Sequence, residues 1–148
     1  MGMYNKIAVF LDGTEAQDIV MDRAIEVAAE NNASLTVCHV IDSTALESAS
    51  SYPSDLVAGL ADAFRKSISD KLDEANMNGR IKSVNVQIEF GRLRETIMDD
   101  IINPMNPDCV ICGARGLSAL KYALLGSVST FLTRQCPCDV LVVKNKML

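Results

Sequence analysis

Three glycines near the C-terminal end of the chain have a spacing suited to phosphate binding. Gly113 and Gly116 are separated by two residues, and nine further residues lead to Gly126 and Ser127. Glycine lets the backbone turn where a side chain would obstruct a ligand. We expect a helix to begin near Ser127, and the first N–H groups of a helix are unpaired and lie at the positive end of its dipole. The segment therefore predicts an anion site built of backbone amides, with Arg115 as a candidate cation.

This segment matches neither of two familiar nucleotide motifs. The sequence contains no Gly-Lys-Ser or Gly-Lys-Thr of a Walker A loop and no Gly-x-Gly-x-x-Gly fingerprint. Glycines that end a strand and precede a helix are also common turn residues. The residues alone therefore leave two interpretations open, a phosphate-binding loop and a structural turn.

The other polar candidates stand at or near strand ends. Asp12 precedes Gly13 and can either form an Asx turn or contact a ligand. His39, the single histidine, lies inside a predicted strand, so we expect it to pack against its neighbours and not to act as a base or metal ligand. None of these residues predicts a catalytic site or a metal site by itself.

The five cysteines favour structural roles. Cys109 and Cys112 have Cys-x-x-Cys spacing, but three residues apart on a strand their thiols point to opposite faces of the sheet. Cys136 and Cys138 flank a proline, and we expect them to pack as well. The odd number argues against a disulfide framework, and we expect all five thiols to be reduced in the cytoplasm.

Short apolar runs alternate with helical patterns along the chain, in the order βαβαβαβαβ. We expect strands over residues 6–11, 34–41, 84–90, 108–112 and 140–143. Strands separated by single helices pair in parallel through right-handed crossovers, so the fold class is α/β, with helices on both faces of a five-stranded parallel sheet. The third run alternates apolar and polar residues, which predicts a strand at a sheet edge. In open sheets of this kind, ligands bind beyond the carboxyl ends of the strands.

Two helix predictions are specific enough to be tested. Thr14 and Gln17 have the spacing of a capping box for the first helix. Apolar residues at helical spacing over 56–72 predict one long helix that ends at Asn78 and Gly79. Residues 42–54 before it form the longest expected loop.

The bulk composition describes one domain over residues 1–148, with 49% hydrophobic and 22% charged residues. A net charge of −5 argues against non-specific binding to nucleic acid or to an anionic membrane. No apolar run approaches the length needed to cross a bilayer, and the N-terminus lacks the apolar core of a signal peptide. We therefore expect a cytoplasmic protein that binds neither nucleic acid nor membrane.

The chain resembles the universal stress protein family over essentially its whole length. The Gly-x-x-Gly spacing, followed after nine residues by Gly-Ser, is similar to the signature of the ATP-binding members. The run from Lys6 to Glu15 resembles the family's first strand and acidic turn, and the stretch ending at Asp42 resembles the end of its second strand. Phe90 and the tail from Cys136 also match in order, although Asp139 stands where many members have proline.

This resemblance implies the fold in more detail. It implies a doubly wound, Rossmann-like sheet of the adenine nucleotide alpha hydrolase type, with strand order 3-2-1-4-5. The last strand is then an apolar sheet edge, and an uncovered edge of this kind is prone to pair with another chain. Members of the family commonly form homodimers through this strand, so the predicted interface is Val140, Leu141, Val142 and Val143.

The resemblance also implies an adenine-nucleotide site. Asp12 resembles the acid at the adenosine end, with Leu11 beside it, and Val40 resembles the residue whose backbone meets adenine. The positions that resemble the phosphate-binding loop are Gly113, Gly116, Gly126, Ser127, Val128 and Ser129. A role for Arg115 as the phosphate cation rests on its place in this loop and not on the resemblance.

The predicted ligand is ATP, or ADP or AMP, and the predicted role is regulatory. A second interpretation is a slow ATP hydrolase or self-phosphorylating protein in which Mg²⁺ bridges the phosphates. Against catalysis, the loop offers neither a P-loop lysine nor a placed base for water. A third interpretation, an interaction protein with an empty pocket, fits the intact glycines less well.

Overall fold

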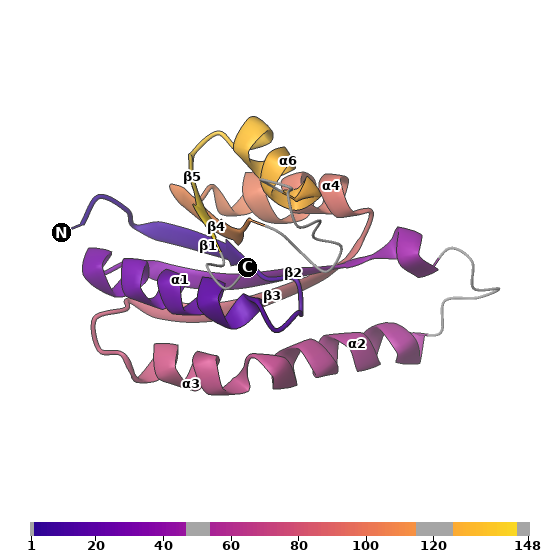
Figure 1. Ribbon diagram of the computed structural model, residues 1–148, viewed down its shortest axis with the longest axis horizontal. Coiled ribbons are helices and arrows are strands. Elements are labelled where there is room, and N and C mark those ends of the chain that lie inside the picture. The colour runs from indigo at the N-terminus through magenta and orange to yellow at the C-terminus, as the bar shows by residue number, and fades with distance from the viewer. Residues whose placement is uncertain (1, 47–53, 115–125, 145–148) are drawn as a thin grey trace.

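The computed structural model describes residues 2–46, 54–114 and 126–144. Its five strands form one parallel sheet in the order β3-β2-β1-β4-β5, as predicted (Figure 1). The strands are β1 (Lys6–Phe10), β2 (Ser34–Asp42), β3 (Ser83–Gly91), β4 (Cys109–Gly113) and β5 (Asp139–Val143). β3 pairs only with β2 among the described strands, which confirms its predicted place at a sheet edge.

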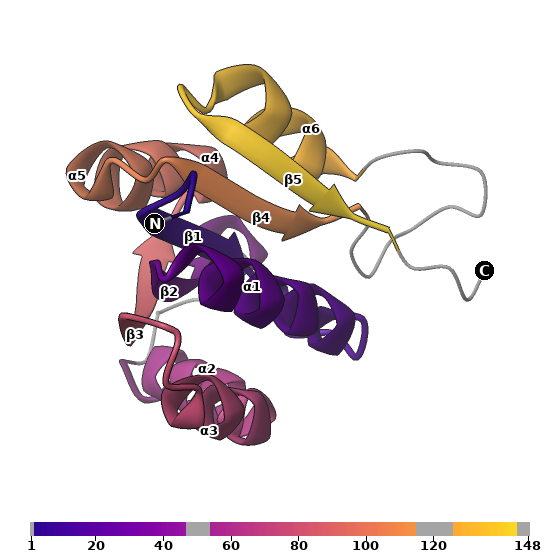
Figure 2. The ribbon, with the colours of Figure 1, turned by 90° about the vertical axis from the view of Figure 1, so that its left-hand side faces the viewer.

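Helices cover both faces of this sheet (Figure 2). One face carries α1 (Gln17–Asn31), α2 (Ser54–Ser67) and α3 (Ser69–Met77). The other face carries α4 (Leu93–Thr96), the π-helical turn η2 (Ile97–Ile102), α5 (Asn103–Met105) and α6 (Ser127–Gln135). A short 3-10 turn, η1 (Ser43–Leu46), follows β2. None of the helices in the described ranges is long and apolar enough to cross a membrane.

Alternating side chains of the strands build one apolar core on each face. Ile7 and Val9 of β1 pack in the core beneath α1, whereas Ala8 and Phe10 pack in the core beneath η2 and α6. This period of two is the ordinary geometry of a strand. Burial of these side chains, most of which are almost inaccessible to solvent, fixes the strand register and therefore the positions of the strand ends.

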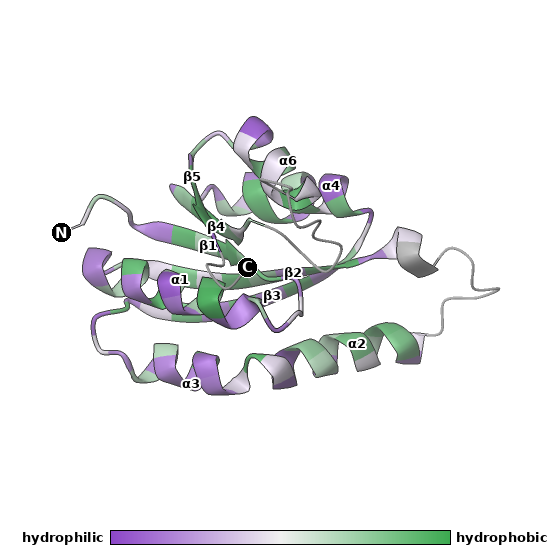
Figure 3. Cartoon of the chain, viewed as in Figure 1, coloured by the Kyte–Doolittle hydropathy of each residue, from purple (hydrophilic) through white to green (hydrophobic). Residues whose placement is uncertain are grey.

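The long helix predicted over residues 56–72 is wrong, because the chain breaks into α2 and α3 at Ile68. Ser67 ends α2, since its hydroxyl donates to the carbonyl oxygen of Phe64 at 2.6 Å. Phe64 is buried, whereas Leu56 and Leu60 at the start of α2 are 41% and 40% exposed. The first part of α2 carries apolar residues (Figure 3), and its two leucines are partly exposed to solvent.

The predicted capping box at the first helix is also wrong. α1 begins at Gln17 after Ala16, and no side chain caps it. Thr14 instead donates its hydroxyl to Asp12 Oδ1 at 2.7 Å, and Gln17 Oε1 accepts from the Gly13 N–H at 2.9 Å. The polar residues of the expected box therefore hold the turn that precedes the helix.

Candidate functional site

The carboxyl ends of the central strands lie together at one edge of the sheet. Phe10 of β1 lies in register with Cys38 of β2 and with Cys112 of β4. The helix that follows β1 covers one face, whereas the helix that follows β4 covers the other, so the chain diverges between these two strands. Such a point, where the strand order reverses, is where doubly wound folds form a ligand crevice.

Asp12 begins the turn after β1 in the manner of an Asx turn. Its Oδ1 accepts hydrogen bonds from the Thr14 N–H at 2.9 Å and from the Thr14 hydroxyl at 2.7 Å. Both bonds use one oxygen, and a carboxylate has a second that can accept from a ligand. Gly13 follows with φ +84°, a conformation that glycine adopts without steric cost. The turn thus presents the exposed Asp12 at the strand end.

His39 holds the same turn from β2. Its Nδ1 donates to the carbonyl oxygen of Leu11 at 2.8 Å, because a carbonyl can only accept. Its ring stacks on Phe64 of α2, with centroids 4.2 Å apart and planes 4° from parallel. This confirms the expectation that His39 packs against its neighbours. The sequence did not indicate that it would position Leu11.

The N-terminus of α6 faces this edge from the β4 side. The first helical bond runs from the Thr130 N–H to the Gly126 carbonyl at 3.0 Å, so the N–H groups of Ser127, Val128 and Ser129 have no partner within the helix. Gly126 adopts extended φ and ψ angles as the N-cap residue. These features confirm the predicted start of the helix and give the amide geometry that binds anions in other proteins.

Ser129 closes the base of the glycine loop. It is 1% exposed, and its hydroxyl lies 3.0 Å from the carbonyl oxygens of both Ala114 and Gly126. The Gly126 N–H also donates to Ala114, and the Ala114 N–H donates to Val143 at 2.9 Å. Ser129 therefore ties the two ends of the loop together, and its hydroxyl is used within the protein.

The remaining predicted site residues differ in how the fold places them. Gly113 ends β4, and Val40 of β2 and Val128 of α6 both pack, half-buried, against the core beneath η2 and α6. Leu11 is buried in the opposite core. Arg115 and Gly116 lie outside the described residues, so their predicted contacts stay predictions.

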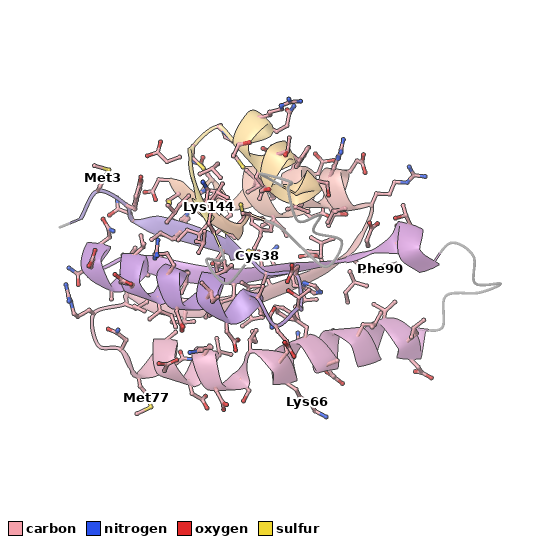
Figure 4. The ribbon with its side chains drawn as sticks, in the orientation of Figure 1. Met3, Cys38, Lys66, Met77, Phe90 and Lys144 are labelled. Carbon is pink, nitrogen blue, oxygen red and sulfur yellow. The ribbon has the colours of Figure 1, made fainter. Side chains whose placement is uncertain are left out.

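The cysteines have the chemistry of core residues. Cys109 and Cys112 belong to opposite cores, which confirms that their thiols point apart. Burial raises the pKa of Cys109 to about 11, that of Cys112 to about 12 and that of Cys136 to about 11. Burial also raises the pKa of Cys38, which lies in the middle of the sheet (Figure 4). A thiol is nucleophilic only as a thiolate, so these side chains stay protonated and unreactive near neutral pH.

The last strand is a sheet edge, as the resemblance implied. β5 pairs with β4 alone among the described strands, Val143 is buried, and Val140, Leu141 and Val142 are half-buried. In the described part of the chain, no group of three or more histidine, cysteine or carboxylate side chains is placed to hold a metal ion.

The strand order and the divergence between β1 and β4 define a doubly wound α/β protein of the Rossmann-like class. The model of the universal stress protein family matches residues 3–144, and the chain belongs to that family. A curated universal stress protein of Staphylococcus saprophyticus is 33% identical over 98% of this chain and 86% of its own length.

Solved structures share the fold. The structure of hypothetical protein MJ0577 is 27% identical, with a TM-score of 0.84 over 99% of both chains. A universal stress protein in complex with cAMP has a TM-score of 0.67 at 23% identity and covers 95% of this chain and 97% of its own. One from Archaeoglobus fulgidus in complex with dAMP has a TM-score of 0.60 at 15% identity over 96% and 99%.

Proposed function

We propose that this protein binds an adenine nucleotide, ATP in particular, at the carboxyl edge of its sheet. The observation that carries the proposal is the meeting of two features there. The first N–H groups of α6, which have no partner within the helix, lie on one side of the strand divergence, and the exposed Asp12 lies on the other. An amide cradle suits phosphates, and a carboxylate suits the hydroxyls of a ribose.

In this proposal, the residues of the carboxyl edge have different roles. Asp12 accepts from the adenosine end, and Val40 contacts adenine with its backbone. Ser129 supports the glycine loop from below through its bonds to Ala114 and Gly126. His39 keeps the turn of Asp12 in place through Leu11. The residues that surround the phosphates are Gly113, Arg115, Gly116, Gly126, Ser127 and Val128.

Two family structures support an adenine ligand, since they are complexes with cAMP and dAMP. The choice of ATP rests on the spacing of Gly113, Gly116, Gly126 and Ser127, which resembles the signature of the ATP-binding members of the family. The sequence has no P-loop lysine to promote transfer, so the proposed role is nucleotide-dependent regulation in a stress response. Phosphate-bound Mg²⁺ would enter with the nucleotide.

We also propose that two copies pair through β5. Among the described strands β5 pairs only with β4, and its apolar side chains from Val140 to Val142 are half-buried. Pairing across a two-fold axis would cover that edge. Replacing Leu141 with lysine should shift the protein from dimer to monomer in sedimentation experiments, and an unchanged dimer would contradict this interface.

Titration calorimetry with ATP, ADP and AMP tests the proposed function. We expect submillimolar binding to the wild-type protein, and release of nucleotide into the supernatant when freshly purified protein is denatured. Gly126→Val should abolish binding, because a branched side chain at the N-cap position would crowd a ligand bound by the first N–H groups of α6. Gly59→Val is the matched control, since Gly59 on α2 has open space beside it. Equal binding by both variants, or no binding to the wild type, would overturn the proposal.

A further inference from the structure

A groove of about 300 Å³ runs along α6 next to α4 and reaches the first residues of α6. The two helices lie side by side in both ribbon views (Figures 1 and 2). The groove is lined by Arg94, Gly126, Ser127, Thr130, Phe131, Arg134 and Gln135. It therefore begins at the residues to which we assign the nucleotide phosphates and continues outward along the helix.

The charge of this groove differs from that of the whole chain. Its lining includes two arginines and no acidic residue, although the protein has a net charge of −5. Neither guanidinium forms an ion pair with a carboxylate of the described residues. The groove is thus a positive surface, open to an anion, on an acidic protein.

Arg94 is the better placed of the two arginines. Its guanidinium carbon lies 5.6 Å from the centre of the Phe131 ring, a cation–π contact that holds the side chain over α6. Phe131 is one turn beyond Ser127, about 6 Å along the helix axis. Arg134 lies nearly two turns beyond Ser127, about 10 Å along the same axis. Arg94 is therefore within the span that a chain of phosphates starting at Ser127 would cover.

We propose that this groove receives the distal phosphates of the bound nucleotide, with Arg94 as their charge partner. This inference rests on the proposed nucleotide site and adds a selectivity to it: the site should bind a nucleoside triphosphate more tightly than a monophosphate. A guanidinium donates to phosphate oxygens in a fixed fork, which makes it a strong partner for such a group. The sequence lacks a P-loop lysine, and Arg94 on a different helix supplies the cation instead.

The test compares ATP and AMP binding by calorimetry in the wild type and in variants of two arginines. Arg94→Gln should weaken ATP binding about tenfold or more, the size of one charge-assisted hydrogen bond, and change AMP binding less than about twofold. Arg80→Gln removes the same charge from an exposed turn before β3 and should change neither affinity. Arg94→Lys should lie between the wild type and Arg94→Gln, because it keeps the charge and loses the fork. Raising the salt concentration should weaken ATP binding less in Arg94→Gln than in the wild type.

The outcomes separate this inference from the proposed function. A wild type that binds ATP, with Arg94→Gln lowering ATP and AMP affinity equally or not at all, overturns the inference and leaves the nucleotide site in place. The inference is also overturned if Arg80→Gln lowers the affinity for ATP as much as Arg94→Gln does. A wild type that binds no adenine nucleotide overturns both. Arg94 is exposed, so thermal unfolding of the variant should match that of the wild type and exclude misfolding as the cause.

Discussion

The strands begin along one edge of the sheet, the amino edge, and end along the opposite one, the carboxyl edge. These two edges use their polar groups differently. At the amino edge, the Asp108 carboxylate accepts from the N–H groups of Asn5 and Lys6 at 2.8 and 3.0 Å, and Lys6 Nζ donates to the Met105 carbonyl. Tyr4 donates its hydroxyl to Asp139 at 2.7 Å. These bonds tie the start of the chain to the sheet.

At the carboxyl edge, polar groups of the described residues hold two turns. The turn after β1 is held by Gln17 and His39, and the base of the glycine loop is held by Ser129. The first N–H groups of α6 are not used by the helix. Within the described residues, the amino edge uses its polar groups in its own hydrogen bonds, whereas the first N–H groups of α6 at the carboxyl edge have no partner in the helix. Ligand binding is therefore expected at the carboxyl edge alone.

The largest expected effect comes from removing the aromatic support of the carboxyl edge. Phe64→Ala deletes a ring that is 4% exposed and stacked on His39, and should lower the free energy of unfolding by about 3–4 kcal/mol. Leu60→Ala, one turn earlier and 40% exposed, should cost less than about 1 kcal/mol. Urea unfolding measures both, and similar losses would show that Phe64 is not an anchor.

At the amino edge, Asp108→Ala should affect stability and not function. It leaves two backbone N–H groups without their carboxylate, so we expect a loss of about 1–3 kcal/mol in the free energy of unfolding. ATP affinity should stay within about twofold of the wild type, since the substitution is at the opposite edge from the proposed site. Asp99→Ala, on the exposed side of η2, serves as the control and should change neither quantity. A marked loss of ATP binding in Asp108→Ala would contradict the division between the edges.

The counterpart of Asp108→Ala at the carboxyl edge is Ser129→Ala, which should lower both the free energy of unfolding and the affinity for ATP. Ser129→Ala removes the buried hydroxyl between Ala114 and Gly126, which should cost about 1–2 kcal/mol in the free energy of unfolding and weaken ATP binding. Ser127→Ala is two residues away on the same helix and exposed, so it should leave stability within about 0.5 kcal/mol. If Ser127→Ala destabilised the protein as much as Ser129→Ala, the role of Ser129 as a tie would be wrong.

The smallest expected effect is a pH dependence at the amino edge. The hydrogen bond to Asp139 is the main cause that raises the pKa of Tyr4 to about 12. Because the folded pKa exceeds the unfolded value of about 10, this bond stabilises the protein below pH 10, and the contribution is lost as pH rises toward 12. Wild type and Tyr4→Phe should therefore differ slightly at about pH 8, and the difference should shrink above about pH 10 and vanish near pH 12 in thermal melts. If the difference in stability between the two proteins did not change with pH, the ionisation of Tyr4 would not be coupled to folding.

Periodicity and resemblance predicted the sheet well. The ends of each strand lie within about two residues of the prediction. β1 and β4 are short apolar runs buried on both faces, which leaves little choice of register, and β3 follows from its alternating pattern. The start of α6 after Gly126 also follows from local residues. The break at Ile68 does not, since apolar spacing continues through it and the side-chain bond from Ser67 to Phe64 decides where α2 ends.

The site was predictable in outline and not in its supports. Glycine spacing and resemblance indicated Asp12 and the loop before Ser127, which are local features. The tie made by Ser129, the contact of His39 with Leu11 and the nearness of Arg94 to Phe131 join segments distant in sequence or depend on rotamers. A single sequence does not show which segments come into contact. The residue type alone therefore does not distinguish Ser129 or Arg94 from the other serines and arginines of the chain.

The most direct test of nucleotide binding at the carboxyl edge is to follow backbone amide resonances by NMR while ATP is added. We expect the largest shifts at Gly126, Ser127 and Val128, with further shifts at Asp12 and Val40. The amides of residues 5 and 6, at the amino edge, should not move. Saturable shifts centred on the amino edge or on the face of α2, with the α6 amides unchanged, would contradict the claim that the helix N-terminus holds the nucleotide.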